Sequence, residues 1–144
     1  MLLAVEQHPG LVHLVSTVEG RLRPGAGWAD LFAPGSATIN PRFESVLDRI
    51  AAALNEVPGP VLIVGHSDSQ PIRSFRYQNN FELSSDRALS VLRRLETTVS
   101  VPARLQSNGV GSTQPRYVPD DTAENRAKNR RVEIVHVFSG EATP

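Results

Sequence analysis

The sequence predicts an α+β fold: a two-layer sandwich with a four-stranded mixed sheet and helices mainly on one face. Two observations favour this class. Short apolar runs bounded by turn residues alternate with segments whose apolar residues recur every three or four positions. The resulting order is strand, helix, strand, helix, strand, helix, strand (a βαβαβαβ pattern). A chain of 144 residues without cysteine also suits one domain whose core needs no disulfides.

We divide the chain into three parts. Residues 1–24 are expected to be a linker or adapter segment that is partly helical, although Pro9-Gly10 interrupts its start. Its apolar residues recur at helical spacing: Leu11, Leu14, Val15, Val18 and Leu22. The break at residues 24–27 opens a core domain over residues 25–140, and residues 141–144 form a tail.

The first half of the core domain is expected to form a strand, a helix and a second strand. Residues 28–32 are the first strand. The helix begins after Asn40, a good N-cap, and Pro41 suits its first position. Its apolar face holds Phe43, Val46, Leu47, Ile50 and Leu54. The apolar run at residues 61–64 follows a Pro-Gly-Pro turn and predicts the second strand.

The second half begins with a long polar loop. Residues 66–81 show no periodicity, and a loop of that length in a small domain is often functional. Ser84 is expected to cap the second helix, and residues 104–110 form the third strand. Asp121 and Glu124 form a capping-box pair that opens the third helix. Residues 132–138 alternate as the closing strand.

Composition argues against several classes of partner. The 15 basic and 15 acidic residues give zero net charge, so duplex nucleic acid and an anionic membrane surface are not expected partners. No apolar stretch approaches the roughly 20 residues that span a bilayer, and Met1–Val5 does not resemble a signal peptide. A protein acting outside the cytoplasm would need a transmembrane helix upstream. The four histidines lack metal-ligand spacing, and no metal or cofactor is expected.

One segment resembles a catalytic motif. Residues 65–69, Gly-His-Ser-Asp-Ser, follow a strand and nearly match the G-x-S-x-G nucleophile elbow of α/β-hydrolases. Three features oppose that interpretation: Ser69 replaces the second glycine, a long loop replaces the required helix, and His136 lies within a strand pattern. We therefore do not expect an enzyme.

The charges around this segment suggest binding instead. Asp68 lies just beyond a strand, and Arg87 falls in the first turn of a helix capped by Ser84. Amides at a helix start and a guanidinium both favour a carboxylate. If the two side chains are close, Arg87 can hold a carboxylate and Asp68 an ammonium. The alternatives are an Asp68–Arg87 salt bridge or two solvated charges.

Four motifs in order carry a family resemblance. They are G-H-S-D at residues 65–68, N-F-E-L-S-x-x-R-A at 80–88, G-x-G at 109–111 and N-R-R-V-E-I at 129–134. Over residues 30–138 the chain resembles the OmpA-like peptidoglycan-binding domain. The resemblance implies non-catalytic binding of diaminopimelate, the zwitterionic end of the peptide stem, with Asp68 and Arg87 in the motif positions that bind it.

The resemblance also suggests supporting ligand contacts from Asn80, Leu83, Ser67 and Arg130. Each has an alternative role. Asn80 is equally suited to a turn or cap, Leu83 to packing with only its amide facing the ligand, and Arg130 to a solvated helix face. Ser67 stands where the family usually has threonine and keeps the hydroxyl.

The loop insert narrows the resemblance. Residues 70–73 and 79–81 look like the insert of flagellar stator proteins and of the type VI secretion protein TssL, and residues 32–37, 51–59 and 120–131 resemble the TssL extension most. This implies a periplasmic part of an inner-membrane protein that anchors a secretion complex to the wall, with its other membrane subunits and a possible homodimer as partners. A stator-type anchor and a protein-interaction module remain the alternatives.

Overall fold

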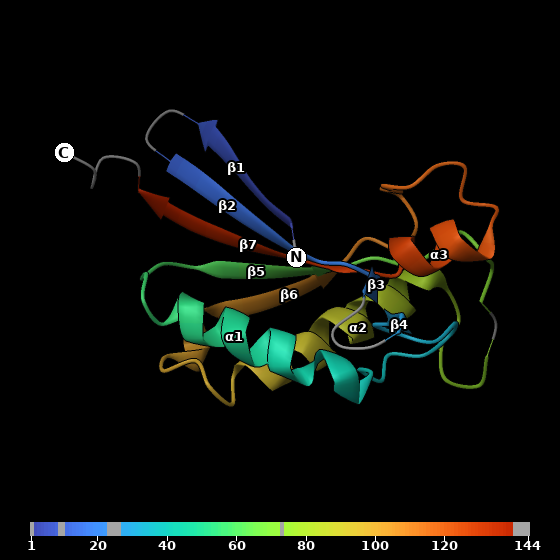
Figure 1. Ribbon diagram of the computed structural model, residues 1–144, viewed down its shortest axis with the longest axis horizontal. Helices are drawn as coiled ribbons and strands as arrows, with labels where there is room; N and C mark the ends of the chain where they lie inside the picture. The colour runs from blue at the N-terminus through green and yellow to red at the C-terminus, as the bar shows by residue number, and fades with distance from the viewer. Residues whose placement is uncertain (1, 9–10, 23–26, 73, 140–144) are drawn as a thin grey trace.

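The computed structural model describes residues 2–8, 11–22, 27–72 and 74–139. The predicted tail at 141–144, residues 24–26 of the predicted break, and Arg73 of the predicted insert lie outside the described residues. The main sheet has the strand order β1-β2-β7-β5-β6 (Figure 1). Its strands are β1 (Leu2–His8), β2 (Leu11–Val18), β5 (Val61–Gly65), β6 (Leu105–Gly109) and β7 (Val132–Ser139).

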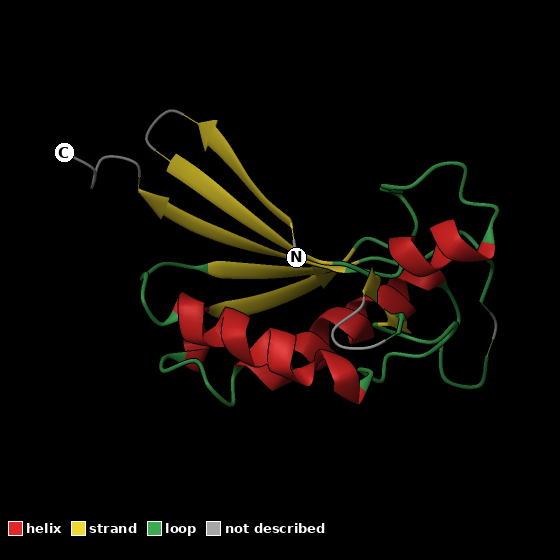
Figure 2. Cartoon of the chain, viewed as in Figure 1, coloured by secondary structure: helices red, strands yellow, loops and turns green. Residues whose placement is uncertain are grey.

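The α-helices of the described residues are α1 (Glu44–Leu54), α2 (Asn80–Leu95) and α3 (Ala123–Asn129). The first two lie on one side of the sheet (Figure 2). Helix α2 packs on β5 and β6, α1 packs on α2, and α3 lies beyond the strand ends (Figure 2). Strands β5 and β6 are parallel and the other pairs are antiparallel. The predicted α+β class, with a mixed sheet and helices packed against it, is confirmed.

The strand count differs from the expected four. The predicted strand at residues 28–32 shortens to β4 (Ala29–Asp30), which pairs with β3 (Arg21–Leu22) in a separate two-stranded sheet. The main sheet instead gains β1 and β2. Within the described ranges, no helix is long and apolar enough to cross a bilayer.

The helix expected in residues 1–24 is wrong. Most of this segment forms the β1–β2 pair, and β2 pairs with β7 along its whole length, from Leu11 with Ser139 to Val18 with Val132. Its apolar spacing fits either period, but Pro-Gly between two partly apolar runs is also a turn signal that suits a hairpin. Pairing of residues 11–18 with β7 favours the strand over the helix.

The helix starts also differ in part. Asn40 caps the short 3₁₀ turn Pro41–Phe43 before α1, as expected, by accepting from the Arg42 amide. Helix α2, however, begins five residues earlier than expected, because the Asn79 side chain accepts from the Glu82 amide. Ser84 is therefore not the cap. Helix α3 is capped by Thr122, not by Asp121.

Two glycines bring α2 against the strand ends. A Cβ at Gly65, the last residue of β5, would lie 2.0 Å from the Ser84 carbonyl oxygen, and one at Gly109 would lie 2.3 Å from the Ser85 nitrogen. Ser84 uses this proximity, since its Oγ accepts from the Gly111 amide at 2.8 Å. Glycine is therefore required at both positions, and the contact sets the distance between α2 and the loop after β5.

We predict that Gly65→Ala destabilises the protein by about 1–3 kcal/mol or more, because the added methyl overlaps backbone that cannot move alone. Urea unfolding followed by circular dichroism measures the change. Ala52→Ser on the exposed face of α1 is the control and should change stability by under about 0.5 kcal/mol. Equal stability of Gly65→Ala and wild type would contradict the close contact.

Candidate functional site

A pocket of about 180 Å³ opens where the loop after β5 meets the start of α2. It brings together four of the six predicted site residues: Asp68, Asn80, Leu83 and Arg87. Its remaining walls come from two loops, residues 34–35 and 70–72. Segments distant in sequence thus converge on one small cavity that combines apolar walls with the side chains of Asp68 and Arg87.

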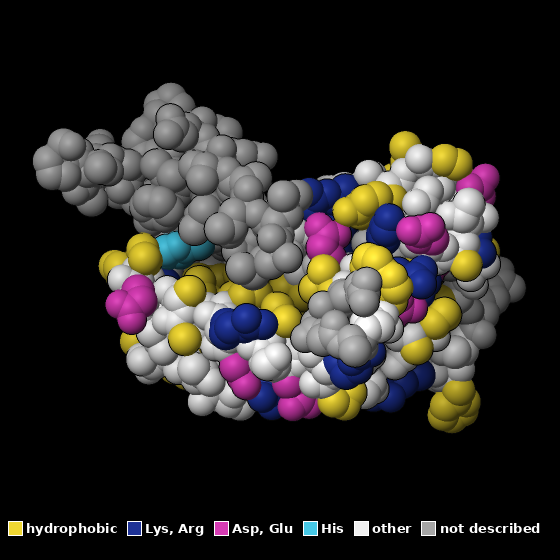
Figure 3. Space-filling model, viewed as in Figure 1, with side chains coloured by type: hydrophobic (Ala, Val, Ile, Leu, Met, Phe, Trp, Pro, Cys, Tyr) yellow, Lys and Arg dark blue, Asp and Glu magenta, His cyan; other side chains and the backbone are white. Residues whose placement is uncertain are grey.

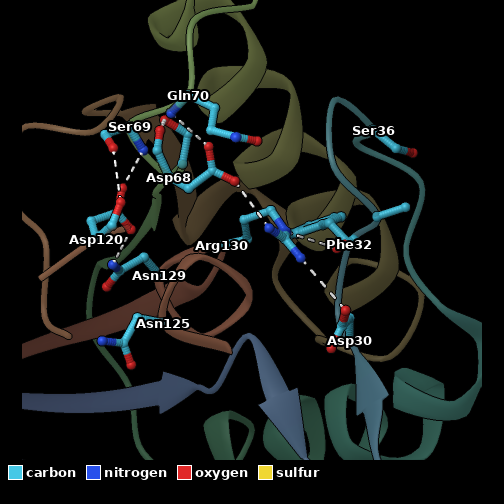
Figure 4. Close-up of polar contacts among 12 residues, drawn as sticks. Asp30, Phe32, Ser36, Asp68, Ser69, Gln70, Asp120, Asn125, Asn129 and Arg130 are labelled. Atoms are coloured by element: carbon cyan, nitrogen blue, oxygen red, sulfur yellow. Dashed lines mark hydrogen bonds and ion pairs between the residues drawn. The ribbon is translucent and has the colours of Figure 1, made fainter. Parts of the chain in front are cut away.

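Asp68 lies on this pocket with both carboxylate oxygens engaged (Figure 4). Its Oδ2 accepts from Arg130 at 2.9 Å, and its Oδ1 accepts from the Gln70 amide at 3.0 Å. Arg130 is buried, so the alternative role on a solvated helix face is wrong. The guanidinium also contacts Asp30 Oδ2 at 3.5 Å and donates to the Phe32 carbonyl, so it supports Asp68 from behind the pocket.

Arg87 exposes no surface to water and donates to three backbone carbonyls: Ser36 at 2.8 Å, Ala33 at 3.1 Å and His66 at 3.4 Å. Among the described residues no ion pair joins it to Asp68, so neither a direct salt bridge nor two solvated charges describes this pair. The placement in a first helical turn is also wrong, because α2 starts at Asn80.

The electrostatics of Arg87 favour an anion. Burial, with the nearby Arg130 charge, lowers the pKa of Arg87 to about 10, and Asp68 opposes this shift. The guanidinium is still charged at neutral pH, but its burial is costly. Three described bonds leave part of the five-donor capacity of the guanidinium for a ligand.

The other predicted residues take supporting positions. Asn80 donates from Nδ2 to the Gln70 carbonyl at 3.1 Å, and Leu83 is buried with its amide donating to the Asn79 carbonyl. Ser67 is buried and donates to the Asp68 carbonyl at 3.0 Å, outside the residues that line the pocket.

Asp120 is a site residue that the sequence reasoning missed. Its Oδ2 accepts from the Ser69 amide at 2.6 Å and its Oδ1 from Asn129 Nδ2 at 2.6 Å (Figure 4). Asn129 is fully buried and also accepts from the Arg116 and Tyr117 amides. The loop before α3 is thereby fastened to the residue after Asp68. No local pattern in the sequence marks this contact.

A second polar cluster lies behind the loop that carries Asp68. The buried His66 has Nε2 3.4 Å from Glu133 Oε1, and the same oxygen accepts from Arg131 at 3.0 and 3.2 Å. The His66 ring, followed by the Arg131 guanidinium, lowers the pKa of Glu133 to about 2, against the opposing effect of burial. Among the described contacts, no hydrogen bond joins the His66 ring to a serine hydroxyl, and Ser67 Oγ donates to the Asp68 carbonyl instead.

Comparison with known proteins identifies the fold. Residues 31–130 match the OmpA family. The chain belongs to the OmpA family. Its class, the OmpA-like peptidoglycan-binding domains, is a non-catalytic family.

Curated relatives of this OmpA-family chain are longer than it is. It is 38% identical over 109 residues to the Bacillus subtilis (strain 168) protein YtxE, covering 74% of this chain and 44% of that protein. It is 36% identical over 101 residues to motility protein B of Helicobacter pylori (strain J99), covering 69% and 39%. The chain thus spans about two-fifths of each relative.

Two solved structures share the whole OmpA-like architecture. The cell wall anchor of the type VI secretion system from Pseudomonas aeruginosa has a TM-score of 0.72 and 38% identity, covering 95% of this chain and 87% of that one. The periplasmic domain of Helicobacter pylori MotB has a TM-score of 0.71 and 28% identity, covering 96% and 82%. Both cover residues beyond the family match.

We predict that Asp120→Ala loosens the loop that carries Asp68. Loss of a charge-assisted hydrogen bond of roughly 1.5–3 kcal/mol should speed hydrogen exchange of the Ser69 amide at least about tenfold. Exchange followed by NMR gives the rate. The neighbouring Asp121→Ala, an exposed carboxylate, is the control and should leave that amide unchanged. Equal exchange in both variants would show that Asp120 does not hold the loop.

The depressed pKa of Glu133 predicts a pH dependence. Its ionised form contributes stability above the unfolded pKa near 4.5, and this contribution is lost as the pH falls toward 2. Glu133→Gln should lower stability at pH 7 by about 1–2 kcal/mol, after allowance for solvent screening, and flatten the profile between pH 4.5 and 2. Urea unfolding across that range tests it. The exposed Glu124→Gln should keep the wild-type profile, and a steep profile in Glu133→Gln would contradict this role.

Proposed function

We propose that this OmpA-family domain binds the diaminopimelate of the peptidoglycan peptide stem and thereby anchors a membrane complex to the cell wall. The observation that carries the proposal is the shared pocket of Asp68 and Arg87. The ligand carboxylate approaches Arg87 and its ammonium approaches Asp68.

The two halves of the pocket suit the two charges of the ligand. Arg87 has only backbone carbonyls as its described hydrogen-bond partners, so a ligand carboxylate supplies the anion that its buried charge lacks. Asp68 shares its charge with Arg130 and offers an ammonium the remaining lone pairs of its carboxylate. A pocket of about 180 Å³ suits the end of one residue, since whole drug-sized ligands need roughly 300–1,000 Å³.

Binding requires a wall of the pocket to shift. Arg87 borders the pocket but exposes no surface to water. The two loop walls meet at one point, because a Cβ at Gly35 would lie 3.4 Å from Ile72 Cδ1. A ligand that reaches the guanidinium therefore displaces residues 34–35 or 70–72. Asn80 and Leu83, on the rigid first turn of α2, form the fixed side.

The wider setting follows from the relatives. Identity of 38% to the secretion-system cell wall anchor extends over 95% of this chain and favours the secretion assembly. A flagellar stator is the near alternative, since motility protein B of Helicobacter pylori is 36% identical over 69% of this chain. We place the domain in the periplasm as part of a longer inner-membrane protein. The other membrane subunits of the complex and a second copy of the chain are its proposed partners. Use of the fold as a protein-interaction module is the alternative.

The balanced surface fits a specific ligand better than bulk attraction. On the face shown in Figure 3, Lys and Arg side chains alternate with Asp and Glu over α1 and the loops. Together with a net charge of zero, this supports local recognition by Asp68 and Arg87. A field of one sign would instead favour nonspecific association.

We predict that Asp68→Asn and Arg87→Lys each weaken binding of a diaminopimelate-containing muropeptide by at least about tenfold. Asn lacks the negative charge that pairs with the ligand ammonium, and Lys keeps the positive charge but lacks the planar donor pair of the guanidinium. Isothermal titration calorimetry measures the affinity. These conservative variants keep side chains that fill the buried space, and a thermal melt checks the fold. Gln106→Ala, on the exposed edge strand β6, is the control and should bind like wild type.

Two outcomes decide against the proposal. Wild-type affinity in both folded variants would exclude the Asp68–Arg87 pocket. Failure of purified sacculi to retain the wild-type domain, with capture by secretion subunits, would favour the protein-interaction alternative.

A further inference from the structure

A larger groove of about 620 Å³ lies next to the pocket of Asp68 and Arg87. Its lining includes Trp28, the chain's single tryptophan, whose side chain is 60% exposed. Polar residues also line the groove, namely Asp30, Thr38, Asn40 and Arg42. The Arg21 guanidinium lies over the indole ring, 5.8 Å from its centroid. A cavity of this size, with one aromatic ring and a few polar groups, has the composition of a small-molecule site.

The groove and the pocket are parts of one surface. Pro34 lines both cavities. Ser36 lines the groove and accepts from Arg87 through its carbonyl at 2.8 Å. Asp30, on the groove side, contacts Arg130, which in turn holds Asp68 (Figure 4). A polymer bound at Asp68 therefore has the groove as its next contact surface.

The groove is preorganised. Arg42 donates to the carbonyls of Gly27 and Trp28 at 3.2 and 3.4 Å, and Asn40 donates to the Asp30 carbonyl at 3.0 Å. These bonds hold the backbone that presents the indole and the Asp30 carboxylate. A site with fixed contact groups loses less entropy when a ligand binds.

The polar chemistry favours an uncharged ligand. Arg42 is engaged with carbonyls, and Arg21 faces Asp30 at 3.9 Å. Both ion pairs of Asp30, at 3.9 and 3.5 Å, are long, so its oxygens keep capacity to accept hydroxyl groups. A pyranose ring offers such hydroxyls at its edge and an apolar C–H face to an aromatic ring.

We propose that the groove is a sugar subsite, which takes an N-acetylated hexose of the glycan strand while the pocket holds the stem peptide. The inference rests on the proposed function and extends it from the peptide to the sugar of the same polymer. Trp28 contacts the sugar face, and Asp30 and Asn40 contact its polar edge.

Because Trp28 is the single tryptophan, its fluorescence reports occupancy of the groove. The full chain is titrated with two probes: the diaminopimelate-containing stem tripeptide and the same tripeptide joined to its disaccharide. We expect the disaccharide tripeptide alone to shift the emission and to bind roughly five- to twentyfold more tightly. Equal affinities and unchanged emission for the disaccharide ligand would overturn the sugar subsite.

Variants locate the sugar contact. Trp28→Ala should bind the disaccharide tripeptide only as tightly as the tripeptide, with tripeptide affinity unchanged, and Trp28→Phe should recover part of the gain. The matched control is Phe75→Ala, which removes a fully exposed aromatic outside the groove lining. Loss of the sugar gain in Phe75→Ala but not in Trp28→Ala would place the sugar on the loop and overturn the inference.

The same titrations separate this inference from the proposed function. A wild-type protein that binds the tripeptide without a gain from the disaccharide keeps the peptide pocket and loses the sugar subsite. A wild-type protein that binds neither probe overturns both. Asp68→Asn should weaken both ligands equally, because its contact lies in the shared peptide.

Discussion

The guanidinium of Arg87 joins three segments that are distant in the sequence. It projects from α2 and donates to the carbonyls of residues 33 and 36 and of His66. A backbone carbonyl buried without a donor is destabilising, so these three bonds make the loop conformations depend on one side chain. The pocket, its two loop walls and the approach to the neighbouring groove all rely on that arrangement.

A chain of charges extends from this centre. Behind the pocket, Arg130 lies between two carboxylates and contacts both Asp30 and Asp68. Arg87 adds a second buried cation whose nearest described partners are neutral. Buried ion pairs contribute little net stability when desolvation is counted. Here the ion pairs of Arg130 fix the position of the Asp68 carboxylate. The same cavity then holds the Arg87 guanidinium, whose described hydrogen-bond partners carry no negative charge.

Local patterns in the sequence predicted the elements that depend on local physics. The Asn40 cap of the 3₁₀ turn before α1 and the strands at residues 61–64 and 132–138 follow from short-range signals. Nonlocal contacts decided the rest. The apolar spacing of residues 11–18 fits both a helix and a strand, and pairing with β7 selects the strand. Ser84 does not cap a helix, because its hydroxyl accepts a hydrogen bond from the Gly111 amide.

The site divides in the same way. Asp68 and Arg87 stand in family motifs, and the structure places both on one pocket. Asp30 and Asp120 reach it through contacts across about 100 and 51 residues of sequence separation, which no local spacing encodes. The burial of Arg130 has the same origin, since its partners lie in the first half of the chain.

The register of the β1–β2 hairpin has a mechanical consequence. Leu2 pairs with Thr17, Thr17 with Glu133 and Glu133 with Val64, so the beginning of β1 is level with the end of β5 that leads to Asp68. Tension between Leu2 and a ligand held at Asp68 therefore runs across the strands. Such a load opens the hydrogen bonds of β1 one after another from Leu2 instead of shearing them together. If the proposed function holds, β1 would therefore separate from the sheet before the strands that lead to the pocket.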